Sequence, residues 1–422
     1  MMLRKFALLP LVVSMGMASS QHPSAAEFNL FCRILGKAND MMYGSNYVYN
    51  ENVDRAIMRE MEELYNITTG NMNDFGKMLW KTKDFLTDHP PPKETKNLQE
   101  AHRKIGKLID EGEKKIEENR KIAVDANKKI DEAKLYVAKG IYGEHVTEVP
   151  KEDGNISDIL DNTSSIFVNN TSAVHSCGYY EDSPGKTLIN DLFCLCVGDP
   201  IDAHGPCHPK IWPPKGRSGT NGKWTQIKYG SETLGVIQSF NESFEKIERV
   251  CRKEMIKAKI KTERMPALLG EFVAMIGKVA TKPDEEGKYI FGHSGRSKHR
   301  ELVTECDGSV GESDGTEAAE KYNEKICVDY EKNFKNGQYE IAWHNKFREA
   351  SEKMNEAKEL EEKILKNRAT LILLKSQAWI AYSREKEDET ANLDDMDIAH
   401  LLDATKTSSI SPFPYLFLSL IL

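Results

Sequence analysis

The chain has 422 residues and a formal net charge of −8, and this acidic balance argues against a nucleic-acid-binding protein. Charged residues make up 29% of the sequence and aromatic residues only 8%, which favours long solvated helices over the compact core of an enzyme. The length is sufficient for a sizeable core in one or two domains.

Residues 1–20 have the pattern of a secretory signal peptide. Two basic residues precede an apolar run from Phe6 to Val13, and residues 18–20 are small, as a signal peptidase requires. We expect the mature chain to begin near Gln21. The competing interpretation, an N-terminal membrane helix, is weakened because the apolar run is far shorter than the roughly 20 residues that span a bilayer.

Residues 27–86 carry an apolar repeat that predicts helix with interruptions. The apolar positions at helical spacing are Phe28, Leu35, Ala38, Val53, Ile57, Met61, Leu64, Phe75 and Leu79. The prolines at 90–92 end this stretch, because proline cannot continue a helix and restricts the residue before it.

Residues 98–137 carry the clearest pattern in the sequence, a heptad repeat whose steps alternate between four and three residues. Its positions are Leu98, His102, Ile105, Ile109, Gly112, Ile116, Asn119, Ala123, Ala126, Ile130, Ala133 and Val137. A helix of this length forms a rod of about 60 Å. Small and polar positions such as Gly112 and Asn119 favour close packing against bulky side chains of a partner helix.

Residues 141–229 are irregular, with four cysteines, a Pro-Pro pair at 213–214 and a glycine-rich run at 216–222. They predict a disulfide-pinned head lobe with short strands. Residues 281–316 form a second glycine-rich, irregular segment, which we assign to the same head lobe. Between them, residues 230–280 predict another helical stretch with a break near Pro266. Its apolar positions are Ile237, Phe240, Phe244, Ile247 and Val250.

A second long helix is predicted from about Glu317 to Glu389. Its apolar stripe contains Trp343, Phe347, Ala350, Met354, Ala357, Ile364, Leu371, Leu374, Ala378 and Ala381. This stripe is bulkier than the seam at 98–137, so the two complement each other in a helical hairpin or a bundle of three or more helices. The expected fold is mainly α, an elongated antiparallel helical hairpin or coiled-coil bundle with a disulfide-rich, irregular head lobe that contains short strands.

The C-terminal region predicts an acidic stalk and then a lipid-anchor signal. Residues 386–403 form the stalk. Three small residues at 403–405, a polar spacer at 406–411 and an apolar stretch at 413–422 follow the order of a glycosylphosphatidylinositol (GPI) attachment signal. We expect attachment at Asp403, with Ala404 and Ser408 as alternatives, and removal of residues 404–422. The competing interpretation is a buried C-terminal strand or helix.

The eight cysteines are even in number, and a secreted chain meets an oxidising compartment, so four disulfides are expected. The residues are Cys32, Cys177, Cys194, Cys196, Cys207, Cys251, Cys306 and Cys327. Cys194 and Cys196 are too close to bond comfortably to each other, so each should pair elsewhere. Cys306 and Cys327 are expected to close the second glycine-rich loop. The full connectivity stays open.

Six Asn-x-Ser/Thr sequons are candidate N-glycosylation sites. They are Asn66, Asn155, Asn162, Asn169, Asn170 and Asn241. Four of them crowd between 155 and 170, which places this segment in an exposed loop. Asn169 and Asn170 are adjacent, so we do not expect both to be occupied, and the sequence alone does not say which sequons are used.

Motifs for ligand chemistry are weak. Residues 184–187 (PGKT) resemble part of a phosphate-binding loop, but Tyr180 stands where that loop needs glycine. Cys194, Cys196 and Cys207 could ligate zinc with His204 and His208, yet the spacing fits no common finger and the compartment favours disulfides.

A basic glycine-rich loop at 292–300 contains His293 and His299 and could bind an anion or an acidic glycan, although a solvated loop is the simpler interpretation. The sequence has no His-Glu-x-x-His motif, and it places neither a Gly-x-Ser-x-Gly elbow nor a paired acidic motif in a convincing context. We therefore predict no catalytic residue, no metal and no cofactor.

Taken together, the signal peptide, helical rod, cysteine-rich head lobe, second long helix and anchor signal resemble the variant surface glycoproteins of African trypanosomes. The segments at 31–35 (FCRIL), 192–198 (LFCLCVG) and 306–308 (CDG) are similar to the congolense-type members. The resemblance assigns residues 21–385 to the N-terminal type of domain in this family. No cysteine follows Cys327, whereas many members carry a small cysteine-rich C-terminal domain there; the acidic stalk is expected in its place.

The resemblance implies a homodimer packed through the long helices and anchored by glycolipid to the outer face of the plasma membrane. It implies a coat antigen and not an enzyme. Dense packing, glycans and antigenic variation would keep host antibodies from invariant membrane proteins. Two other hypotheses stay open: a nutrient or host-protein receptor on the same scaffold, and an anchored ectoenzyme.

Overall fold

The computed structural model describes residues 22–69, 87, 95–152, 154, 156–198, 205–214, 223–229, 237–258, 263–280, 286–296, 303–309 and 323–384. The chain divides into two compact units. We call the described residues within 45–132 and 353–384 the bundle unit, and those within 22–44 and 133–352 the disulfide unit. Helices α4 (Thr95–Tyr142) and α11 (Ala342–Arg384) contribute residues to both.

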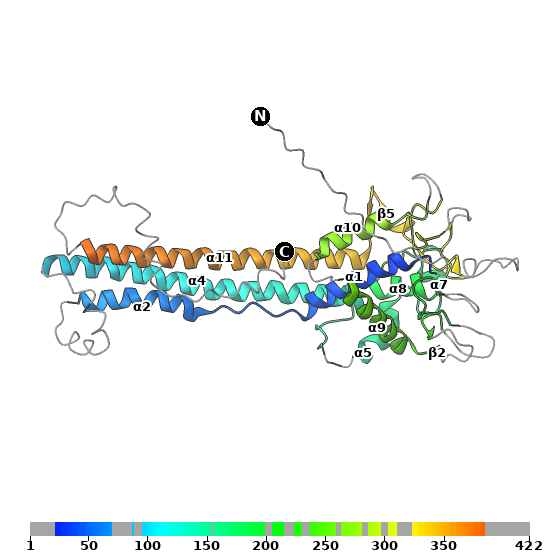
Figure 1. Cartoon of the computed structure of the whole chain (residues 1–422), viewed down its shortest axis with the longest axis horizontal. Coiled ribbons are helices and arrows are strands. Elements are labelled where there is room, and N and C mark those ends of the chain that lie inside the picture. The colour runs from blue at the N-terminus through cyan, green and yellow to red at the C-terminus, as the bar shows by residue number, and fades with distance from the viewer. Residues whose placement is uncertain are drawn as a thin grey trace, which may run out of the picture. The chain divides into compact units, whose positions relative to one another are not determined.

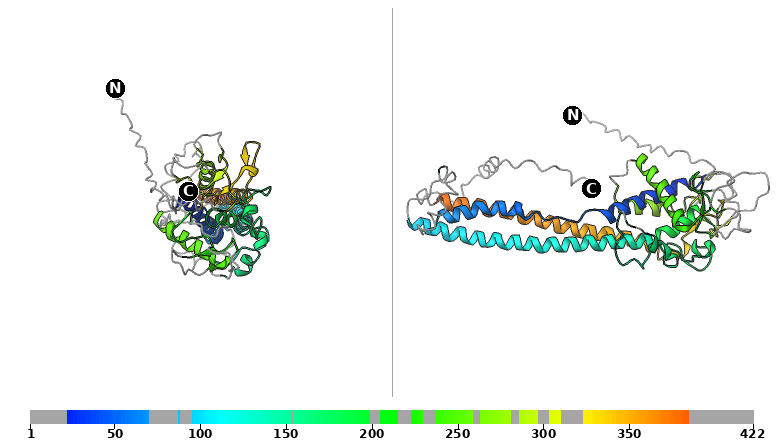
Figure 2. Two further views of the ribbon diagram at one scale, coloured as in Figure 1. Left: turned by 90° about the vertical axis from the view of Figure 1, so that its right-hand side faces the viewer. Right: turned by 90° about the horizontal axis from the view of Figure 1, so that it is seen from below.

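In the described part of the bundle unit, three helices lie side by side: α2 (Glu51–Ile67), residues 95–132 of α4 and residues 353–384 of α11 (Figures 1 and 2). The α4 helix is antiparallel to α11, because Asn119 meets Asn367 while the later Lys129 meets the earlier Glu356. These contacts confirm the predicted antiparallel helical bundle.

The heptad positions of α4 up to Ile130 contribute to the core of the bundle unit. Ile105, Ile116, Asn119, Ala126 and Ile130 are among the buried positions of that seam. Ile105 and Ile116 pack against apolar residues of the other two helices, which include Met58, Met61 and Leu64 on α2 and Leu371, Leu374 and Ala378 on α11. A Cβ at Gly112 would overlap Met58 Sδ, so the glycine lets α2 approach closely. The predicted packing of small against bulky residues is confirmed.

The helical stretch predicted from residue 27 is interrupted. Helix α1 (Ala25–Tyr43) ends at Gly44, and residues 44–50 are not helical. Asn127 of α4 holds this segment, because its Oδ1 accepts the Tyr47 N–H at 2.8 Å and its Nδ2 donates to the Tyr47 carbonyl at 2.9 Å. A side chain distant in sequence thus supplies the bonds that a helix would have made. The predicted positions between 70 and 86 lie outside the described residues.

The disulfide unit packs its helices around a cluster of aromatic side chains. Besides α1 and the adjoining ends of α4 and α11, its helical elements are α5 (Ser157–Asp161), α6 (Thr163–Ile166), α7 (Ala173–Ser176), α8 (Leu188–Cys196), α9 (Phe240–Ala258), α10 (Met265–Met275) and the 3₁₀ turn η3 (Glu331–Asn333). Helix α1 contacts α8, α9 and α10. Phe31 lies 5.8 Å from Phe272, 4.8 Å from Phe291 and 5.8 Å from Trp343 between ring centroids.

The expected short strands pair in three two-stranded antiparallel sheets within the described residues. They are β1 (Ile227–Lys228) with β2 (Ile237–Gln238), β3 (Ile290–Phe291) with β4 (Val328–Asp329), and β5 (Phe334–Lys335) with β6 (Gln338–Tyr339). All six strands belong to the disulfide unit.

The predicted start of the second long helix near Glu317 is wrong, because α11 begins at Ala342 and residues 328–339 form β4, η3, β5 and β6. Asn336 and Gly337 join β5 to β6 with positive φ angles of 53° and 81°. This combination is the type I′ hairpin turn that Asn-Gly favours, so the dipeptide was a local signal against helix.

The helical stretch predicted over 230–280 differs at its start, where Ile237 lies in β2. The break predicted near Pro266 is confirmed, because residues 263–264 are not helical and α10 begins at Met265, with Pro266 in its first turn. Proline fits there because the first helical residues have no N–H partner within the helix.

Candidate functional site

All eight cysteines form disulfides within the disulfide unit. The pairs are Cys32–Cys251, Cys177–Cys194, Cys196–Cys207 and Cys306–Cys327. The last three close loops with sequence separations of 17, 11 and 21 residues. A cross-link of this size stabilises a fold by about 3 kcal/mol, chiefly by restricting the unfolded chain. The first pair joins α1 to α9, so irregular segments and helices are tied into one scaffold.

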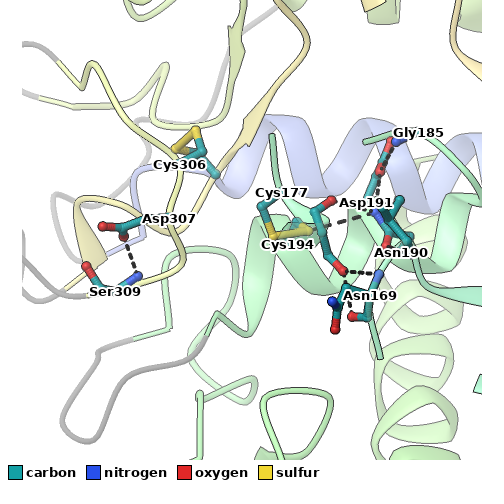
Figure 3. Close-up of a disulfide and its surroundings, with 12 residues drawn as sticks. Asn169, Cys177, Gly185, Asn190, Asp191, Cys194, Cys306, Asp307 and Ser309 are labelled. Atoms are coloured by element: carbon teal, nitrogen blue, oxygen red, sulfur yellow. Dashed lines mark hydrogen bonds between the residues drawn. A yellow bond between two sulfur atoms is a disulfide. The ribbon is translucent and has the colours of Figure 1, made fainter. Parts of the chain in front are cut away.

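Helix α8 places a fully buried carboxylate, Asp191, beside the Cys177–Cys194 disulfide (Figure 3). The helix starts after Thr187, whose Oγ1 accepts the Asn190 N–H at 3.0 Å as an N-cap. Four groups donate to the Asp191 carboxylate: Gly185 N–H at 2.9 Å, Asn190 Nδ2 at 3.0 Å, Tyr330 Oη at 2.5 Å and Trp343 Nε1 at 2.7 Å.

Asp191 therefore connects the segment before α8, the residue after β4 and the first turn of α11. Burial raises the pKa of Asp191, while the hydrogen bonds that it accepts oppose this change. Burial and the facing carboxylate raise the pKa of Tyr330 well above its ordinary value, which keeps the phenol as a hydrogen-bond donor.

The segment that holds the clustered sequons is fastened to α8 through Asn190 and Ser176. Asn190 Oδ1 accepts the N–H of Val168 at 3.0 Å, and its Nδ2 donates to the Ser176 carbonyl at 3.2 Å. Ser176 Oγ accepts the Asn169 N–H at 2.9 Å and donates to the Asn169 carbonyl at 2.7 Å (Figure 3). The next residue, Cys177, is bonded to α8, so this segment has a fixed backbone.

The segment at 306–308 is held in a similar way. Asp307 Oδ1 accepts the Ser309 N–H at 2.7 Å beside Cys306 (Figure 3). Gly308 donates its N–H to the Lys325 carbonyl at 2.9 Å and has a φ of 76°, a value that favours glycine.

The bundle unit contains a second buried polar network, centred on Asp54 of α2, whose side chain is fully buried. Asp54 accepts hydrogen bonds from Tyr49 Oη at 2.7 Å, Asn119 Nδ2 at 3.0 Å and Arg368 Nε at 2.5 Å. Asn367 Nδ2 donates to Asn119 Oδ1 at 2.9 Å. Each of the three helices contributes to the network, so it specifies how they align along their axes.

Residues 61–371 match the family model described as the trypanosomal VSG domain. The chain belongs to the trypanosomal VSG domain family. The match begins within α2, includes α4 and ends within α11. It confirms the predicted resemblance to variant surface glycoproteins, whereas the congolense-type subgroup stays a prediction. No curated protein matches the chain.

VSG family membership makes this a protein of the cell-surface coat type. Over the residues that the structure describes, none of the helices combines the length and the apolar character needed to cross a membrane.

In this VSG chain, the PGKT segment is the N-terminal cap of α8. Gly185 donates to Asp191, and Lys186 Nζ donates to the carbonyls of Ser164 at 2.7 Å and Phe167 at 2.9 Å. Burial lowers the pKa of Lys186. The groups that would face a phosphate are thus engaged with the protein itself.

The cysteines weighed as zinc ligands are all engaged in disulfides. Cys194 pairs with Cys177, and Cys196 pairs with Cys207, so neither is bonded to the other, as predicted. His204 lies outside the described residues. Among those that are described, no group of three or more His, Cys, Asp or Glu side chains could hold a metal ion.

The expectation of a solvated loop at 292–300 is wrong for His293, which is only 1% exposed. Hydrogen bonds to the start of α1 hold His293 in this buried position. Ser24 Oγ accepts the His293 N–H at 2.9 Å, and Glu27 Oε1 accepts the Ser294 N–H at 2.9 Å. His293 Nε2 donates to the Ile326 carbonyl at 3.0 Å. His299 lies outside the described residues.

This burial predicts a pH-dependent stability. Burial and the nearby Arg296 lower the pKa of His293 from 6.5 to about 3. Between these values the unfolded chain binds a proton that the folded chain does not, so the free energy of unfolding should fall with decreasing pH, by at most about 1.4 kcal/mol per pH unit. Glu27 opposes this trend, because burial raises its pKa and its protonation favours the folded chain.

The variant His293→Asn should flatten this slope, since asparagine tolerates the φ of 59° at this position but does not titrate. Urea unfolding of both proteins across the pH window measures the effect. Equal slopes in the two proteins would show that His293 is not the responsible group.

The two carboxylates at the centres of the networks were not identified from the sequence. The sequence does contain a signal for Asp191, because this residue stands inside the strongly apolar run LINDLFCLC. A lone acidic residue in such a run indicates a buried, hydrogen-bonded carboxylate. The sequence contains no comparable signal for Asp54, because its hydrogen-bond partners Asn119 and Arg368 are 65 and 314 residues away in the chain.

Proposed function

We propose that this chain is a GPI-anchored, N-glycosylated coat antigen of the parasite surface. In this proposal it is a homodimer and not an enzyme, and dense packing with antigenic variation shields the membrane from host antibody. The family match over residues 61–371 carries the proposal. The three-helix bundle and the four disulfides support it, because they give a helical scaffold with a cross-linked unit that tolerates surface change.

The anchor is supported by the sequence pattern around Asp403, and the secretory route by the pattern at residues 1–20. Both lie outside the described residues. Treatment of intact cells with a phosphatidylinositol-specific phospholipase C should release the protein. Mass spectrometry of its C-terminal peptide should find the ethanolamine of the anchor on Asp403. Retention on the cells without a glycolipid would contradict the anchor.

Surface abundance tests the coat role directly. A coat antigen should dominate the surface proteome of the cells that express it. A scarce protein that retains a serum ligand during purification would contradict the coat role and support a receptor.

The homodimer is supported by an exposed apolar stripe on α11 in the bundle unit. Leu365, Ile372 and Leu373 are 57%, 38% and 61% exposed. At 3.6 residues per turn they lie on one side of the helix, away from the buried Leu374. Exposed apolar side chains that gather on one face mark an interaction surface, and the proposed partner is the same stripe of a second copy.

Leu365→Asp together with Leu373→Asp should convert the dimer to a monomer, because two buried carboxylates would lose their water without gaining a partner. Analytical ultracentrifugation of the phospholipase-released protein measures the mass. Lys121→Asp is the matched control, since it places a carboxylate on α4 at a side chain that is 74% exposed. A dimer that survives the double substitution would place the interface elsewhere.

A further inference from the structure

N-glycosylation sets two conditions that can be checked at each sequon. The Asn Nδ2 bonds to the anomeric carbon of a lipid-pyrophosphate-linked oligosaccharide, the bond from that carbon to the phosphate oxygen breaks, and the lipid pyrophosphate leaves with the electron pair while Nδ2 loses a proton. The hydroxyl of the third residue assists when it donates to the Asn Oδ1 and polarises the amide. A usable site thus has this hydroxyl bond and an unengaged Nδ2.

Asn169 meets both conditions. Its Oδ1 accepts the Thr171 hydroxyl at 2.8 Å and the Thr171 N–H at 2.9 Å. Its Nδ2 makes no hydrogen bond within the described part of the chain, and the residue is partly exposed. Because these bonds lie within three consecutive residues, this Asx turn can form on a nascent chain before the rest of the protein folds.

Asn162 meets the same conditions. Its Oδ1 accepts the Ser164 hydroxyl at 3.1 Å, and the residue is partly exposed at the N-cap of α6. None of the described residues bonds to its Nδ2.

The neighbouring Asn170 fails both conditions. Its Nδ2 donates to Thr163 Oγ1 at 3.2 Å. Its third residue, Ser172, caps α7 without a side-chain bond and has no hydrogen bond to Asn170 among the described residues. A sugar on Asn170 would break the contact with Thr163.

At Asn66 and Asn241, the third-residue hydroxyl is turned into the protein. Thr68 is 1% exposed, and its Oγ1 lies 3.0 Å from the Leu64 carbonyl and 2.9 Å from that of Tyr65. Ser243 is fully buried, accepts the Ile227 N–H at 3.0 Å and donates to the Gln238 carbonyl at 3.1 Å. Asn241 Nδ2 also donates to Asp161 Oδ1 at 3.1 Å.

We propose that Asn162 and Asn169 carry N-glycans, and that Asn66, Asn170 and Asn241 do not. This inference rests on the proposed passage through the secretory pathway. Asn155 lies outside the described residues. Both glycans stand on the one segment that Asn190, Ser176 and the Cys177–Cys194 disulfide fix to α8, so they cover a defined patch of the disulfide unit.

Site mapping on the protein released from the parasite surface tests the inference. Peptide N-glycosidase in heavy-oxygen water converts each glycosylated asparagine to labelled aspartate. Label is expected at Asn162 and Asn169 and absent from Asn66, Asn170 and Asn241. Label at any of the last three, or unlabelled Asn162 or Asn169, overturns the inference while leaving the secretory route intact. A surface protein without any glycan overturns the glycosylated coat antigen as well.

Two single substitutions separate the adjacent sequons. Thr171→Ala destroys the acceptor at Asn169 but leaves Asn170-Ala-Ser as an intact sequon. Ser172→Ala destroys the acceptor at Asn170 alone. We expect Thr171→Ala to lose one glycan and Ser172→Ala to lose none, as read from electrophoretic mobility and site mapping. Loss of a glycan in Ser172→Ala, or a glycan on Asn170 in Thr171→Ala, contradicts the proposal. Surface expression of both variants verifies that they fold.

Discussion

Replacing Asp191 by alanine should lower the free energy of unfolding of the disulfide unit by about 4 kcal/mol, because several buried donors lose their acceptor at once. Within the described residues, Gly185 N–H, Tyr330 Oη and Trp343 Nε1 have no other hydrogen-bond acceptor. The loss should appear in denaturant unfolding and as faster amide hydrogen exchange in α8.

A second variant at Asp191 separates the shape of the side chain from its role as a hydrogen-bond acceptor. Asp191→Asn keeps the shape, but its amide would present N–H groups to donors, so it should still cost about 2 kcal/mol. As a control, Asp182→Ala removes a carboxylate that is 51% exposed and pairs with His175, and it should change stability by less than about 0.5 kcal/mol. If Asp191→Asn were neutral, the hydrogen bonds would not be the source of the stability.

The second large effect is expected at Asp54 in the bundle unit. Asp54→Ala leaves Asn119 Nδ2 and the Arg368 guanidinium without their acceptor, and breaking a buried charge pair on one side costs about 3–5 kcal/mol. Since all three helices meet at this network, thermal melting followed by helical circular dichroism should shift to lower temperature. Hydrogen exchange should rise along α2, α4 and α11 together.

Glu62→Ala provides the control on the same helix, because Glu62 is exposed. It should leave the melting curve nearly unchanged. An Asp54→Ala protein that melts like this control would show that the network does not stabilise the bundle.

A complementary variant replaces Asp54, Asn119 and Asn367 by leucine together. Apolar replacement of a whole buried polar network is often neutral or stabilising, so this protein should keep its helices. What it should lose is a single helix alignment, which would appear as broadened or multiple side-chain signals in NMR spectra.

These buried networks also bear on the proposed antigenic variation. Surface substitutions away from special features usually change stability by only about 0.5 kcal/mol. When stability depends on a few buried hubs such as Asp191 and Asp54 and on four disulfides, most exposed residues are free to change. A coat antigen that varies its surface while keeping its scaffold needs this separation.

The sequence alone determined the helical part of the fold. The heptad at 98–137 and the apolar stripe after Trp343 each repeat along a single helix. Such a repeat predicts which face of the helix will be buried, whatever segment packs against it. Their small and bulky residues also predicted that the two helices would pack together. The even cysteine number and the six sequons likewise follow from local chemistry in a secreted chain.

Only the tertiary structure decided what depends on residues far apart in the chain. It paired the cysteines, placed Asn127 against Tyr47 to end a helix, and buried His293 against Ser24 across 269 residues. It also showed which sequon hydroxyls donate to their own asparagine and which form hydrogen bonds with buried groups of the protein. A periodic pattern encodes a buried face, but the partners on that face are set by the packing of the whole chain.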